Sequence, residues 1–73
     1  MSRTLRFDRE IYAGEAVDEA VKIYSPYAEF ELSESPSSWE VTLKAKSEAR
    51  ERKIARELGN YALGLTLRKR GQR

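Results

Sequence analysis

The sequence contains neither cysteine nor histidine, and these two absences exclude a large part of protein chemistry. Without cysteine the chain cannot form a disulfide scaffold, a zinc knuckle or a thiol nucleophile. Without histidine it lacks the commonest general base and metal ligand. No apolar run approaches the roughly 20 residues that a membrane span needs, and no signal-peptide core is present at the start. We therefore expect a cytoplasmic protein that contacts no membrane and holds no metal or cofactor.

Glycine and proline are scarce, with four and two residues respectively. The glycines are scattered and form no phosphate-binding loop. Glu29 and Glu31 form the clearest carboxylate pair, but the alternating pattern around them predicts a solvated strand face, and no calcium loop is present. The serines of residues 33–38 have no histidine to activate them. These features predict that the protein is not an enzyme.

Charge is divided unevenly along the 73 residues, which we expect to form a single domain, 1–73, because the chain is too short for two cores. Residues 1–40 carry four basic and nine acidic side chains, a net charge of −5, whereas residues 41–73 carry ten basic and three acidic ones, a net charge of +7. A basic half can bind acidic proteins or nucleic acid, or it can form a solvated helix face. The expected basic surface consists of Arg50, Arg52, Lys53, Arg56, Lys69 and Arg70.

The first half of the chain changes its hydrophobic period from that of a strand to that of a helix. Residues 4–8 alternate, with Leu5 and Phe7 on one face, which predicts a half-buried strand. Residues 15–24 predict an amphipathic helix, ended by Ser25 and Pro26. Its apolar residues recur at i, i+3, i+4 and i+7: Val17, Ala20, Val21 and Tyr24.

Two further strands are predicted at residues 27–33 and 39–46, because apolar and polar residues alternate in both. Between them, residues 33–38 are rich in turn formers and predict a hairpin loop. On the polar faces, glutamates of the first strand match lysines of the second, including Lys44 and Lys46. This charge complement favours antiparallel pairing.

The last segment allows two interpretations. Ser47 is a suitable N-cap, and an apolar stripe through Ile54, Leu58, Tyr61 and Leu65 predicts a helix. If the helix runs to about residue 68, the element order is β-α-β-β-α, followed by a disordered basic tail at 69–73. If it ends near Tyr61, residues 62–68 form a fourth strand and the fold is ferredoxin-like, β-α-β-β-α-β. We favour the first interpretation.

The expected fold is therefore α+β, with a small, mostly antiparallel sheet of three strands and two helices on one face. A single core is expected to be shared by the sheet and both helices. Its predicted members are Leu5, Phe7, Val17, Val21, Tyr24, Phe30, Leu32, Val41, Leu43, Ile54, Leu58 and Tyr61.

The back of the last predicted helix carries a second apolar strip. Asn60, Leu63 and Leu67 fall opposite the core stripe, and Arg68 follows them. Adjoining exposed leucines are typical of a contact surface. We expect these four residues to bind a partner, either a second copy of the chain in a homodimer or another protein.

The segment 57–68, ELGNYALGLTLR, resembles the closing signature of the small D protein of the His-Xaa-Ser system, in which an asparagine, an apolar pair and a terminal Leu-Arg recur on the last helix. The opening strand around Leu5 and Phe7 is also similar. The resemblance implies an accessory protein of radical-SAM systems thought to modify peptides, with no catalytic role. The predicted function is thus a non-enzymatic interaction module with a protein or peptide partner. The alternative is a small nucleic-acid-binding domain that uses the basic C-terminal half.

Overall fold

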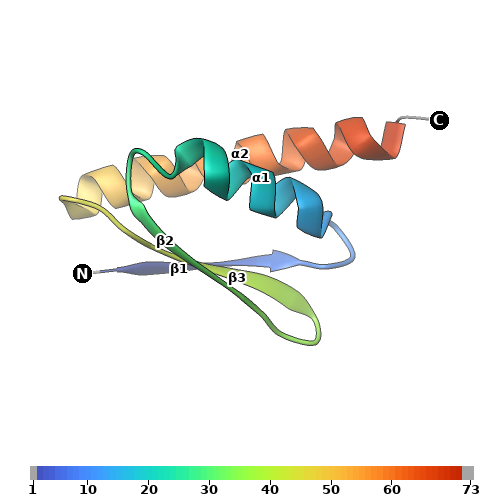
Figure 1. Ribbon diagram of the computed structural model, residues 1–73, viewed down its shortest axis with the longest axis horizontal. Coiled ribbons are helices and arrows are strands. Elements are labelled where there is room, and N and C mark those ends of the chain that lie inside the picture. Colours follow the sequence, from blue (N-terminus) through green and yellow to red (C-terminus); the bar gives the residue numbers. More distant parts are fainter. Residues whose placement is uncertain (1, 72–73) are drawn as a thin grey trace.

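The computed structural model describes residues 2–71. Three antiparallel strands form one sheet in the order β1-β3-β2, and both helices lie on one side of it (Figure 1). The predicted α+β fold with the order β-α-β-β-α is therefore confirmed. The elements are β1 (Arg3–Asp8), α1 (Gly14–Tyr24), β2 (Glu29–Glu34), β3 (Ser38–Lys44) and α2 (Glu48–Gly71).

The central strand, β3, sets the register of the sheet. Val41 lies between Leu5 of β1 and Leu32 of β2, so one row of apolar side chains crosses the inner face beneath the helices. The outer face is polar, and there the Thr4 and Thr42 hydroxyls are hydrogen-bonded at 3.2 Å. This division into an apolar inner and a polar outer face follows from the alternation in the sequence.

The core lies between the inner face of the sheet and both helices. The prediction is wrong for Leu32 and Tyr61, which are 40% and 36% exposed. Leu32 is exposed because β2 is an edge strand, and an open groove separates its inner face from α1. Tyr61 packs against the ring of Tyr24 in a T-shaped arrangement, with 6.0 Å between the ring centroids. The buried cluster consists of Phe7, Val17, Ala20, Val41, Leu58 and Ala62.

Helix α2 continues without interruption to Gly71, so residues 62–68 form no fourth strand and the ferredoxin-like alternative is wrong. The C-terminal half of α2 is held by two hydrogen bonds to the segment that precedes α1. The Thr66 hydroxyl accepts the Ala13 backbone N–H at 3.1 Å, and the Arg70 guanidinium donates to the Glu10 carbonyl at 2.6 Å. Residues 69–71 are accordingly helical where a disordered tail was expected, and 72–73 lie outside the described residues.

The junction between β3 and α2 also differs from the prediction, since β3 ends at Lys44, two residues earlier than expected. The next backbone N–H, at Ala45, donates to the Glu51 carboxylate at 3.1 Å, and Glu51 is only 2% exposed. The Ser47 hydroxyl caps the start of α2, as predicted. Lys46 therefore leaves the strand and does not join the polar outer face.

Replacing Gly14 by alanine should lower the free energy of unfolding by about 1 kcal/mol, because strain of about 1–3 kcal/mol outweighs the better helix propensity of alanine. An added Cβ would lie 2.6 Å from the Trp39 indole. That ring is held by a 3.4 Å hydrogen bond to the Tyr12 carbonyl and by the Arg9 guanidinium, 4.0 Å from the ring centroid. Urea unfolding followed by the fluorescence of the single tryptophan measures the loss. As control, Gly64→Ala adds a Cβ to open space and should stabilise the protein; equal losses would contradict this account.

Candidate functional site

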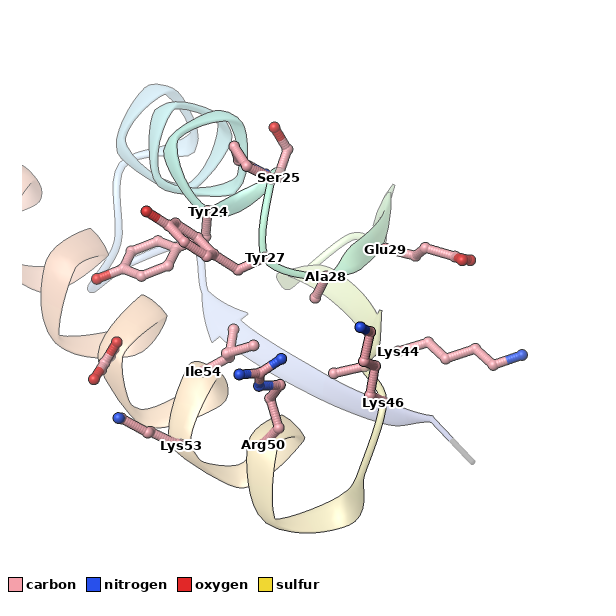
Figure 2. A pocket seen from close by; sticks show the side chains of 13 residues that line it. Tyr24, Ser25, Tyr27, Ala28, Glu29, Lys44, Lys46, Arg50, Lys53 and Ile54 are labelled. Atoms are coloured by element: carbon pink, nitrogen blue, oxygen red, sulfur yellow. The ribbon is translucent and has the colours of Figure 1, made fainter.

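An open groove of about 920 Å³ lies between the α1–β2 connection and the β3–α2 junction (Figure 2). One wall carries Tyr24 and Tyr27, and the other carries Arg50, Lys53 and Ile54 from the first turns of α2. These walls come from segments about 25 residues apart in the sequence, so the site is a product of the fold.

A tight turn after α1 places the two tyrosines. The Tyr27 N–H donates to the Tyr24 carbonyl at 2.9 Å, and the Ser25 hydroxyl donates to the Lys22 carbonyl at 2.9 Å. These bonds prolong the helical path past Tyr24, and β2 consequently begins at Glu29 and not at Tyr27 as predicted. The ring centroids of Tyr24 and Tyr27 lie 6.1 Å apart, and Tyr27 is 64% exposed. The turn thus presents aromatic surface to solvent at the groove.

Three cations gather on the opposite wall and floor: Lys46, Arg50 and Lys53. Figure 2 shows the Arg50 guanidinium directed into the groove. The ion pairs found within residues 2–71 involve none of the three. Lys44 and Glu29 stand opposite each other in the sheet register and point away from the groove at its rim. The groove therefore brings together three cations that take part in none of the ion pairs found in residues 2–71.

Two carboxylates line the groove: Glu29 at its rim, and Glu57 one turn beyond Lys53 on α2. Partial burial raises the pKa of Tyr24, and the negative charge of Glu57 raises it further. Tyr24 is therefore a neutral phenol throughout the physiological range, with an O–H that can donate a hydrogen bond. The groove offers cationic and neutral donors together, which suits an anionic ligand.

The predicted basic surface is divided in space. Arg50 and Lys53 line the groove, whereas Arg52 and Arg56 are exposed on α2 outside its lining. Lys69 and Arg70 lie at the other end of α2, about 30 Å from Arg50 at 1.5 Å per residue. Of these, Lys69 is half-buried and Arg70 binds the Glu10 carbonyl.

The predicted partner strip is less uniform than expected. Asn60, Leu67 and Arg68 are exposed, with Leu67 at 59%, but Leu63 is half-buried. The four residues lie on α2, C-terminal to the part that lines the groove.

Sequence reasoning assigned Lys46 to the outer face of the sheet and Tyr24 to the core, and so missed their place in the groove. Pro26, directly before Tyr27, was the available signal, because a proline after a helix marks a turn, and connecting segments lie at the surface. No comparable signal placed Lys46, since its position depends on the long-range bond between Ala45 and Glu51.

No family model, curated protein or solved structure matches this chain. Within residues 2–71, no helix is long and apolar enough to cross a bilayer. In the same part of the chain, acidic side chains nowhere gather in threes as a metal site requires. The function is therefore inferred from the chemistry of the groove itself.

Proposed function

We propose that this protein is a non-enzymatic interaction module that binds an acidic segment of a partner protein or peptide in the basic groove. The observation that carries the proposal is the gathering of Lys46, Arg50 and Lys53 without ion-pair partners in the described chain. Carboxylates form short, charge-assisted hydrogen bonds with such groups. Electrostatic complementarity of this kind also accelerates association and selects partners.

The tyrosines supply the apolar part of the contact. Tyr27 is exposed and Tyr24 half-buried, so a bound segment would cover aromatic surface as well as charge. A tyrosine side chain gives a large contact area and loses little conformational entropy on binding, because only two side-chain torsions become fixed. The groove thus combines an aromatic wall with a cationic wall, as peptide-binding surfaces commonly do.

The resemblance of segment 57–68 to the D protein family gives the proposal a biological setting. In a peptide-modification system, the acidic segment would belong to the substrate peptide or to the radical-SAM enzyme. The module would act in the cytoplasm as an adaptor between the two. A neighbouring gene for a radical-SAM enzyme would support this setting, and the binding chemistry of the groove does not depend on it.

Single-stranded nucleic acid is the second candidate ligand, and the exposed ring of Tyr27 on the wall facing Arg50 favours it. Bases stack on exposed aromatic rings while nearby cations contact phosphates. The same groove would then bind the phosphate backbone in place of carboxylates.

Charge reversal at Arg50 should weaken binding of an acidic peptide about tenfold or more, since charge-assisted hydrogen bonds contribute about 1.5–3 kcal/mol. The probe is a fluorescein-labelled peptide of alternating glutamate and serine, and the readout is fluorescence anisotropy. Arg52→Glu is the matched control, because it makes the same charge change on the same helix outside the groove lining. Equal weakening by both variants would mean that only net charge matters, and the groove proposal would be wrong.

The same assay separates the two candidate ligands. Labelled oligothymidylate should bind more weakly than the acidic peptide at physiological salt. Tighter binding of the oligonucleotide, with a salt slope of about 0.7 per phosphate contacted, would replace the proposal with nucleic-acid binding.

A further inference from the structure

Strand β2 forms a free edge of the sheet, because within residues 2–71 it pairs only with β3. The backbone groups on its other side are available to a further strand. On the inner face, Leu32 is partly exposed and lines a second groove of about 500 Å³ together with Val17 of α1 and Trp39. The edge is therefore bordered by an open groove whose apolar part, formed by Leu32, Val17 and Trp39, could cover side chains of an added strand, while Glu15, Asp18 and Glu34 supply further negative charge to its lining.

The opposite edge, β1, offers no such surface. Phe7 on its inner face is buried under the helices. On its outer face, Arg6 is already engaged with Glu40 at 3.5 Å. On the inner face, Leu32 of the β2 edge is exposed, whereas Leu5 of the β1 edge is half-buried, so β2 offers the more open apolar side chain.

The outer face of β2 determines the charge of an added strand. Glu29 and Glu31 lie on this face, and Glu31 stands opposite the uncharged Thr42. Glu31 also makes no ion pair in the described chain. Opposite charges on adjacent strands stabilise pairing, and like charges oppose it. A second copy of β2 would bring these glutamates against its own, so pairing of two β2 edges is disfavoured.

We propose that the β2 edge accepts an extended peptide segment as a fourth strand, with apolar side chains directed toward α1 and basic side chains on the outer face beside Glu29 and Glu31. Such strand addition uses main-chain hydrogen bonds for affinity and alternate side chains for specificity. The inference stands apart from the groove proposal, since it uses another surface and a ligand of the opposite charge.

The test uses a labelled, acetylated and amidated hexapeptide of alternating lysine and valine, which matches the length of β2. Strand addition requires backbone N–H groups along one edge of this peptide. N-methylation of alternate residues should abolish binding when it falls on the pairing edge and leave it nearly unchanged on the other edge. The alternating glutamate and valine peptide should bind more weakly at this site. Equal effects of the two methylation patterns would overturn the proposal.

Variants of the protein supply the second arm of the test. Glu31→Lys should weaken binding of the lysine–valine peptide about three- to tenfold, because an attraction becomes a repulsion across the new strand pair. Glu19→Lys makes the same charge change on the exposed face of α1 and should have little effect. Arg50→Glu should change the affinity for the lysine–valine peptide by less than about twofold. Glu31→Lys should likewise leave binding of the acidic peptide in the groove unchanged. Each proposal can therefore fail without the other. Weakening by Glu19→Lys as large as that by Glu31→Lys would overturn the edge proposal.

Discussion

Replacing Leu58 by alanine should lower the free energy of unfolding by about 2–5 kcal/mol. Leu58 is fully buried at the centre of the cluster that joins both helices to the sheet, with Phe7, Val17 and Val41 as other members. Truncation loses the transfer free energy of the removed methyl groups and leaves a cavity that the surrounding side chains fill only in part. In a 73-residue domain, whose stability is modest, this loss is a large fraction of the total.

Urea unfolding followed by far-UV circular dichroism measures the effect. Leu67→Ala is the matched control, because it removes the same atoms from the same helix at a position that is 59% exposed. The control should cost less than about 1 kcal/mol. A loss below 1 kcal/mol for Leu58→Ala would show that α2 does not pack on the sheet as described.

Replacing Thr66 by valine should cost about 1–3 kcal/mol, although the two side chains have nearly the same shape. Thr66 is fully buried, and its hydroxyl accepts the Ala13 N–H where α1 begins. Ala13 is the N-cap residue of α1, so the bond from its N–H to Thr66 ties the start of α1 to α2. Valine would leave the Ala13 N–H without its partner inside the protein, and that unsatisfied donor is the source of the cost.

Amide hydrogen exchange at Ala13 distinguishes the lost bond from a packing defect. Thr66→Val should remove the protection of this amide. Thr66→Ser keeps the hydroxyl and should preserve protection, even though the lost methyl group lowers stability by about 1 kcal/mol. Continued protection of Ala13 in Thr66→Val would contradict the assigned hydrogen bond.

The order of elements could be predicted because each follows from local periodicity. Alternation defines β1 and β3, and the 3.6-residue period defines α1 and most of α2. The exposure of Leu32 could not be predicted in this way, since alternation identifies the inner face of a strand but not its place at the edge of a sheet. The end of α2 was underestimated for a related reason. The contacts that hold it, from Thr66 to Ala13 and from Arg70 to Glu10, span 53 and 60 residues.

The candidate site was predictable in part. Arg50 and Lys53 were identified from the charge of the second half, but the sequence grouped them with Lys69 and Arg70, which lie at the far end of a 24-residue helix. Charge density along a chain does not indicate which charges share a surface. The place of Lys46 in the groove depends on where β3 ends, and a buried carboxylate bound to the Ala45 N–H sets that end.

Titration of ¹⁵N-labelled protein with the acidic peptide, followed by amide chemical shifts, tests the central claim most directly. Binding in the groove predicts shift changes at the amides of residues 24, 25, 27, 28 and 46–54. These changes should be lost in Arg50→Glu at the same peptide concentration. Residues 68–71 at the other end of α2 should remain unperturbed. Changes confined to residues 60–71, with the groove amides unaffected, would contradict the account and place binding on the C-terminal end of the helix.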